Sequence, residues 1–464
     1  MNISHRIKYS YLKRLLKIHP ASLLILSFLG LIVTGTILLK LSISTNAGHL
    51  SVIDALFTAT SAVCVTGLIV VDTGSYFTMF GQCVILVLIQ IGGLGVMTVS
   101  VMLFRIIGRN ITFRQRMALQ DVFAHTPRGD IFQLLKTIFI FTAIVELIGI
   151  GGFFIYWLQS FPVGRAMYLA VFHSISAFCN AGFSVFPDSM MRSSGDWFLN
   201  LNMCLLIILG GIGFPAVYDV YTNWKSRNQE RRKLSVQTKV VFVTTIALIF
   251  FGAVIFWLLE KPHTLSGRPF LETILISVFQ SVTCRTAGFN TVDIALLSDA
   301  TLMAMTGLMF FGASPGSCGG GVKTTSLALI VAFTISRVKK QKRLNLFKKS
   351  IPVETVSRSV SLILVCLSLI GLVLFLILAG NSMQSSFTPA LKTRFIAYLF
   401  ETVSAFGTVG LSMGITPTLS LWGKSWIILL MFIGRVGILT FAYIIIGGGT
   451  EKGREYAEEN IMIG

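Results

Sequence analysis

Long apolar stretches alternate with short polar segments along the whole chain. Eight of them approach or exceed the roughly 20 residues that a helix needs to cross the hydrocarbon core of a membrane. Between paired stretches lie shorter apolar segments, such as 52–63 and 395–406, whose length of about 12 residues suits a helix that enters the membrane only half way. The eight predicted spans are 21–39, 81–104, 134–158, 198–221, 240–259, 302–335, 360–379 and 421–446.

The half-crossing segments end in a glycine motif that recurs four times. Its glycines, Gly67, Gly182, Gly288 and Gly410, are separated by 115, 106 and 122 positions. A phenylalanine stands ten positions before three of them and nine before Gly288, so the third copy departs from the others. Self-similarity of this kind predicts one unit repeated along the chain. The four predicted units are 1–112, 113–233, 234–350, with an intramembrane loop at 312–323, and 351–464.

A non-helical loop that follows a half-crossing helix implies a cavity, because irregular backbone at membrane depth must be buried in protein or face water. Four helix C-termini directed at that cavity carry partial negative charge and favour a cation. The predicted fold class is an all-α membrane protein of four pseudosymmetric helix–pore loop–helix repeats, with eight spanning helices plus four re-entrant half-helices around one central pore. Interfacial helices capped by glycine are the alternative for these segments.

The residues up to each glycine form a predicted selectivity filter. Glycine allows backbone angles that turn successive carbonyl oxygens toward one axis. We therefore expect a dehydrated monovalent metal ion, bound by backbone carbonyls only. No carboxylate is present, which argues against a site for divalent ions. The filter residues are Cys64, Val65, Thr66 and Gly67; Cys179, Asn180, Ala181 and Gly182; Arg285, Thr286, Ala287 and Gly288; and Gly407, Thr408, Val409 and Gly410.

Other polar residues of the half-crossing segments have simpler interpretations. Asp54 and Glu272, near the starts of two segments, suit helix capping better than ion attraction. His173 suits a packed polar residue better than a ligand. For Arg285, a tie to nearby backbone is as good an interpretation as a role in conduction.

The sixth span is interrupted by glycines and a proline, which a helix does not sustain. We predict that this loop lies across the pore below the filter as a gate, and that two deep cations form a barrier to permeant ions. The gate residues are Gly312, Gly316, Gly319, Gly320, Gly321, Lys323 and Arg435. The alternative is that Arg435 bonds loop carbonyls while Lys323 extends to the cytoplasmic interface.

Composition agrees with a membrane protein, since 54% of residues are hydrophobic and only 12% are charged. The net charge of +19 gathers in clusters at 6–17, 105–128, 225–239 and 337–358. The positive-inside rule places these clusters and both termini in the cytoplasm, which explains the charge without a nucleic-acid partner. The seven cysteines have no CxxC spacing and no His cluster beside them, so neither a metal site nor a disulfide framework is expected.

Several motifs in order resemble the Trk/Ktr/HKT superfamily of potassium transporters, and within it the membrane subunit of bacterial Ktr systems. They are Ala181-Gly182-Phe183, Arg285-Thr286-Ala287-Gly288-Phe289, Ser404-Ala405-Phe406-Gly407-Thr408-Val409-Gly410-Leu411 and Phe432-Ile433-Gly434-Arg435-Val436-Gly437. Cys64 and Cys179 stand where the family leads us to expect Thr and Asn.

The resemblance implies potassium uptake across a bacterial plasma membrane, with sodium as an activator and no cofactor in this chain. It also implies a homodimer in membrane lipid on a cytoplasmic RCK-type regulatory ring of the KtrA/KtrC kind, which would carry any nucleotide. No Walker, Rossmann or kinase pattern occurs, so we expect no enzyme activity. The alternatives are a sodium-conducting or mixed Na⁺/K⁺ transporter of the same fold and a twelve-span secondary transporter.

Overall fold

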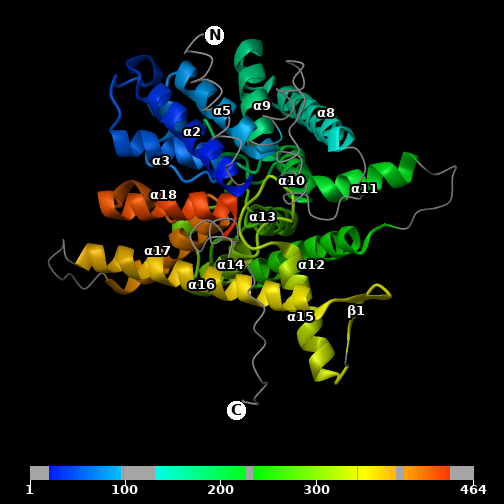
Figure 1. Cartoon of the computed structure of the whole chain (residues 1–464). Coiled ribbons are helices and arrows are strands. Elements are labelled where there is room, and N and C mark those ends of the chain that lie inside the picture. Colours follow the sequence, from blue (N-terminus) through cyan, green and yellow to red (C-terminus); the bar gives the residue numbers. More distant parts are fainter. Residues whose placement is uncertain are drawn as a thin grey trace, which may run out of the picture.

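The computed structural model describes residues 20–95, 98, 131–225, 234–341, 343–382 and 391–438. These ranges are built from helices and one small hairpin (Figure 1). The helices and strands are α2 (Pro20–Lys40), α3 (Val52–Val63), α4 (Thr73–Tyr76), α5 (Met79–Leu94), α8 (Ile131–Trp157), α9 (Val163–Phe178), α10 (Trp197–Gly211), α11 (Phe214–Lys225), α12 (Val236–Glu260), α13 (Phe270–Thr283), α14 (Asp299–Phe310), α15 (Thr324–Val338), β1 (Leu344–Leu346), β2 (Lys349–Ile351), α16 (Val353–Ser382), α17 (Leu391–Gly407) and α18 (Leu421–Val436). Short 3-10 helices occupy Ser42–Ser44, Met191–Ser193, Ile294–Leu296 and Thr416–Thr418.

Three kinds of helix follow one another in the same order four times along the described chain. A long apolar helix comes first in each set (α2, α8, α12 and α16). A second helix of 12 to 17 residues follows (α3, α9, α13 and α17), which is short for a membrane crossing. A third helix completes each set (α5, α10, α14 and α18).

The four sets pack in a closed order. Within each set the first helix contacts the second, and the third helix of a set also contacts the second helix of the next: α5 packs on α9, α10 on α13 and α14 on α17. Helix α18 of the last set packs on α3 of the first, and Figure 1 places these red and blue helices side by side. The first and last sets of helices therefore meet.

The helices in the predicted spans at 81–104, 198–221 and 421–446 are interrupted within the described residues. Helices α5, α10 and α18 each end within two positions of a glycine that has positive φ, a conformation that side chains disfavour. At the middle one the chain bends by 91° between α10 and α11. These glycines are Gly95, Gly213 and Gly437, with φ of 85°, 96° and 93°.

By length and composition, α8, α12 and α16 can each cross a membrane, and the bent pair α10 and α11 is either a fourth, broken span or a re-entrant loop. The other apolar helices of the described chain are shorter. An all-α chain was also predicted, yet β1 and β2 form an antiparallel hairpin in which Leu344 pairs with Ile351. The hairpin lies in the polar segment after α15, where the hydrophobic pattern predicted no element.

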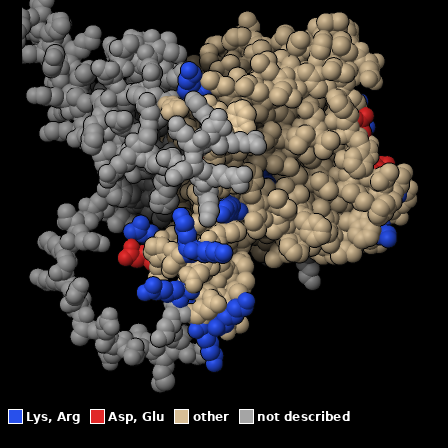
Figure 2. Space-filling model, turned by 90° about the vertical axis from the view of Figure 1, so that its right-hand side faces the viewer, with Lys and Arg blue, Asp and Glu red and all other residues tan. Residues whose placement is uncertain are grey.

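Helix α15 and the hairpin project from the rest of the molecule and carry exposed basic side chains. Figure 2 shows Lys and Arg gathered on this lower lobe, whereas the visible described surface above it has few charges. The basic residues of the lobe are Arg337, Lys339, Lys340, Arg343, Lys348 and Lys349. The predicted clusters at 6–17 and 105–128 lie outside the described residues, so the side of the membrane that they occupy stays a prediction.

Candidate functional site

The four predicted filter segments share one backbone conformation. Two positions before each glycine, a residue that is not glycine has positive φ, which is uncommon and costs on the order of 1–3 kcal/mol. These residues are Val65, Asn180, Thr286 and Thr408, with φ of 56°, 58°, 70° and 50°. Gly67, Gly182, Gly288 and Gly410 then have φ of 89°, 69°, 80° and 94°. Because the same strained turn occurs four times, the surrounding structure must enforce it in each copy.

The filter glycines meet at one place. A Cβ placed on Gly67 would lie only 3.0 Å from the Cα of Gly182. The equivalent distances are 2.9 Å from Gly182 to Gly288, 3.3 Å from Gly288 to Gly410 and 3.0 Å from Gly410 to Gly67. Each such Cβ would also collide with the carbonyl oxygen that precedes a neighbouring glycine, namely those of Ala181, Ala287, Val409 and Thr66. The structure thus brings four backbones and four carbonyl oxygens together, with no room for side chains.

A hydroxyl near the end of each second helix holds the filter segment of the same set. Ser61 Oγ accepts a hydrogen bond from the Gly67 amide at 3.1 Å, and Ser404 Oγ does the same for Gly410. Two others donate to carbonyl oxygens just after the glycines, Ser176 Oγ to Phe183 at 2.7 Å and Thr283 Oγ1 to Phe289 at 2.6 Å. Thr283 stands five positions before its glycine and the serines stand six before theirs. In the third copy the stretch from the hydroxyl residue to the glycine is therefore one residue shorter than in the other copies. The hydroxyl still comes from the end of the second helix.

The predicted gate loop, 312–323, packs directly against the filter backbone. The amide of Gly320 donates to Thr408 Oγ1 at 2.9 Å. A Cβ on Gly312 would lie 2.7 Å from Cγ2 of Thr286, and one on Gly319 would collide with the hydroxyl of the same threonine. Glycines are required here because any side chain would meet the filter.

The second set of helices also holds this loop. The Ser314 amide donates to the carbonyl of Gly211 at 3.1 Å, and the Cys318 amide donates to that of Gly210 at 3.2 Å. In return, the Phe214 amide donates to the carbonyl of Gly316 at 2.9 Å. The loop is therefore fixed between the bend after α10 and the filter.

Both predicted gate cations donate to backbone carbonyls. Arg435 Nη1 donates to Cys318 in the loop, and Nη2 donates to Gly92 at the end of α5. Lys323 Nζ binds the carbonyls of Gly319 at 2.9 Å and Gly320 at 3.3 Å, so it turns back to the loop instead of extending outward. For Arg435, the alternative interpretation predicted bonds to loop carbonyls, and the bond to Cys318 is of this kind. The bonds of Arg435 and Lys323 also hold two positive charges beside the loop. Whether the charges act as a barrier stays a prediction.

Arg285 and His173 are buried behind the filter. Arg285 is 4% exposed, and its Nη2 donates to Thr245 Oγ1 of α12 at 3.2 Å, so its contact is with a side chain of another helix and not with the nearby backbone that was predicted. One ring nitrogen of His173 lies 2.9 Å from the carbonyl of Leu169 and the other 3.1 Å from Ser184 Oγ. This arrangement agrees with a packed polar residue.

The sequence interpretation missed a polar chain inside the apolar helices. Gln90 Nε2 donates to Glu146 Oε2 at 3.2 Å, and the Cys179 thiol donates to Gln90 Oε1 at 3.5 Å. The chain links α8 to the filter residue Cys179. A carboxylate within an apolar span is rare, so Glu146 itself was the signal that could have revealed it.

Known proteins resemble this chain over most of its length. A family model described as TrkH, cation transport protein, matches residues 19–446. Ktr system potassium uptake protein B of Vibrio alginolyticus is 37% identical over 425 residues, which cover 91% of this chain and 90% of that protein. Potassium/sodium uptake protein NtpJ of Enterococcus hirae is 35% identical over 453 residues, which cover 97% of this chain and 98% of that protein.

One solved structure supports the fold. The crystal structure of the potassium transporter TrkH from Vibrio parahaemolyticus superposes with a TM-score of 0.65 and covers 90% of this chain and 84% of that chain. At 18% sequence identity, this similarity concerns the helical fold alone.

Proposed function

Because the chain belongs to the TrkH family of cation transport proteins, we propose that it takes up potassium ions across a bacterial plasma membrane as the membrane subunit of a Ktr-type system. One observation carries this proposal: four glycines and the carbonyl oxygens of four neighbouring residues meet at one place. Backbone carbonyls that replace the hydration shell of the ion are the chemistry of potassium filters.

The pore in this proposal lies on the axis where the four sets of helices meet. Three observations support four pseudosymmetric repeats: the recurring helix order, the closed packing of α18 on α3 and the four matching turns. The short second helices act as re-entrant half-helices whose C-terminal ends present partial negative charge to the ion. The eight proposed crossings are the four first helices and the four apolar segments that begin with the third helices, which alone have only 12 to 16 residues.

Gating in this proposal depends on the loop 312–323. The loop contacts filter residues Thr286 and Thr408, and Arg435 binds it through the carbonyl of Cys318. A fixed positive charge beside a cation path raises the free energy of a permeant cation by Coulomb repulsion, strongly so where the dielectric constant is low. Opening then requires the loop and Arg435 to separate from the path.

We further propose that the chain forms a homodimer and binds a cytoplasmic RCK-type ring. The name of the relative in Vibrio alginolyticus refers to a Ktr system, which implies more than one component for that protein. In this chain the basic lobe of α15 and the hairpin offers an exposed surface for a soluble partner. Nucleotide would bind to that partner.

Rescue of growth tests the proposed function. The chain is expressed in a bacterium without potassium uptake systems of its own, alone and together with an RCK-type subunit. We expect growth at limiting potassium and uptake of labelled rubidium. Absence of both, with the protein present in the membrane fraction, would refute potassium uptake.

Sodium transport is a second candidate, favoured by the potassium/sodium description of NtpJ from Enterococcus hirae. Uptake of labelled sodium into the same cells distinguishes the candidates, because a potassium filter excludes it while rubidium enters. A twelve-span secondary transporter is tested by accessibility tags on both flanks of α3. Tags on the same side of the membrane support a re-entrant helix, and tags on opposite sides contradict it.

A further inference from the structure

The residue after the shared phenylalanine of each half-helix is polar and buried in all four copies. The phenylalanines, Phe57, Phe172, Phe279 and Phe400, are each 0% exposed. The residues that follow them are Thr58, His173, Gln280 and Glu401, none more than 2% exposed. Burial of a polar group costs free energy unless the group is hydrogen-bonded. A polar group at this position in every copy therefore indicates a task that the copies share.

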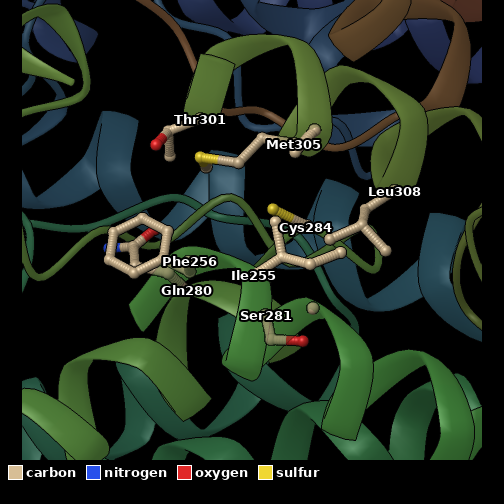
Figure 3. A pocket seen from close by; sticks show the side chains of 10 residues that line it. Ile255, Phe256, Gln280, Ser281, Cys284, Thr301, Met305 and Leu308 are labelled. Carbon is tan, nitrogen blue, oxygen red and sulfur yellow. The ribbon is translucent and has the colours of Figure 1, made fainter. Parts of the chain in front are cut away.

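Two of these residues bind the segment that follows the filter glycine in their own copy. His173 lies 3.1 Å from Ser184 Oγ, and Gln280 Nε2 donates to Thr291 Oγ1 at 3.2 Å. The Oε1 of Gln280 has no partner among the described residues. Gln280 also lines the cavity of Figure 3, between α12, α13 and α14, whose volume of about 10 Å³ is close to that of one water. These two contacts are made by neutral groups.

Glu401 makes the same kind of contact with a carboxylate and binds two hydroxyls. Ser412 Oγ donates to Oε2 at 2.8 Å, and Thr416 Oγ1 donates to Oε1. The Ser412 hydroxyl also accepts the amide of Gly414 at 3.0 Å. One carboxylate thus holds the whole segment 412–416, which begins two positions after Gly410.

Thr58 is the opposite extreme, because its hydroxyl has no partner in the part of the chain that the structure describes. The four copies therefore range from no tie at Thr58 to a doubly bonded carboxylate at Glu401. No ion pair of the described residues involves Glu401 either. Its carboxyl oxygens are bonded by hydroxyls alone.

We propose that Glu401 is a positioning and specificity-determining residue, whose two carboxyl oxygens fix the chain after the fourth filter segment. The inference rests on the proposed function, since it assigns a role within the cation filter. A segment held rigidly behind the fourth filter glycine keeps the filter in a geometry that the correct ion fits, so Glu401 should affect both ion affinity and discrimination.

The test compares Glu401→Gln with Glu260→Gln in the full chain. Glu260 is a matched control because it is equally buried and accepts from Thr264 Oγ1 at 2.9 Å, but it lies at the end of α12. We expect Glu401→Gln to raise the KM for rubidium uptake severalfold, because the amide nitrogen of glutamine cannot accept the hydroxyl hydrogen bond that one carboxyl oxygen accepts. Inhibition by sodium should increase in parallel. Glu260→Gln should leave the KM and the sodium inhibition unchanged.

Two further variants separate positioning from packing. Glu401→Asp keeps two oxygen acceptors and should retain most of the discrimination. Ser412→Ala removes one donor and should shift the KM in the same direction by a smaller factor. Ser412→Ala carries the test if Glu401→Gln is absent from the membrane. Equal KM and sodium inhibition in Glu401→Gln, Ser412→Ala and the unmodified chain would overturn the inference. An unmodified chain that takes up no cation would refute the proposed function instead.

Discussion

Lys424 Nζ lies 2.7 Å from Asp54 Oδ1 and so joins the start of α18 to the start of α3. Asp54 also accepts from the hydroxyl of Ser51, which caps α3 by accepting the Asp54 amide at 3.1 Å. The aspartate is in the first turn of α3, where a cap was predicted, but its second partner comes from 370 positions away. The ion pair thus connects the first and last sets of helices.

Loss of this ion pair is expected to destabilise the protein. The two side chains are only 13% and 20% exposed, so Lys424→Met leaves a largely buried carboxylate without its partner, at a cost of about 1–3 kcal/mol. The measurement is the midpoint of thermal unfolding in detergent. Arg192→Met breaks the pair with Asp188, in which Arg192 is 86% exposed, and should change little. Equal shifts for both variants would contradict a structural role of the Lys424–Asp54 pair.

Neutralising Arg435 is expected to increase cation uptake. Arg435→Ala removes the bond to the Cys318 carbonyl together with the positive charge, and loss of even 1.4 kcal/mol of barrier raises the rate about tenfold. Rubidium uptake per amount of protein is the measurement. Arg192→Ala, in the 3-10 helix Met191–Ser193 where the side chain is 86% exposed, is the control and should have no such effect. Unchanged uptake in Arg435→Ala would show that Arg435 is no barrier to cations and only bonds backbone carbonyls.

A methyl group on a filter glycine is expected to abolish selective uptake. In Gly67→Ala the alanine would have to adopt the φ of 89° that Gly67 has. Its Cβ would also meet the backbone of the next filter segment. Strain of about 1–3 kcal/mol then displaces the carbonyl oxygens. Gly371→Ala in α16, where nothing lies within 4 Å of an added Cβ, is the matched control and should transport normally. Normal rubidium uptake and normal sodium exclusion in Gly67→Ala would argue against the proposed filter.

The displaced hydroxyl of the third copy also has a testable role. Thr283→Val has nearly the same shape but cannot donate to the Phe289 carbonyl, which would cost about 1 kcal/mol. Rubidium uptake should fall several-fold, and Thr283→Ser should restore it because the hydroxyl returns. If the valine and serine variants transport equally well, the hydroxyl does not support the filter.

Hydrophobic pattern alone predicted much of the fold. The half-helix at 52–63 coincides with α3, and the span at 134–158 differs from α8 by at most a few residues. The ends of α5, α10 and α18 were not predicted, because apolar content does not report backbone angles. Gly213, for example, has positive φ although the residues on both sides of it are hydrophobic. The unit boundaries at 112 and 233 lie outside the described residues and stay predictions.

The filter could be located because its glycines recur in one chain, and repetition is visible in sequence. Contacts between copies could not be predicted from the sequence, since they depend on how distant segments pack. Asn180 and Thr286, for example, lie within 3.2 Å of each other across two copies. The partners of Glu401 escaped for a different reason, because serine and threonine after a filter look like ordinary loop residues.

The gate loop and α15 form one continuous piece of chain. Helix α15 begins at Thr324, and Gly320, four residues earlier, is bonded to Thr408. The other end of α15 leads into the basic hairpin, which projects beyond the helices (Figure 1). A displacement of the hairpin would therefore be transmitted to Thr408, in the fourth filter segment, through α15 and the short stretch of loop from Gly320 to Thr324.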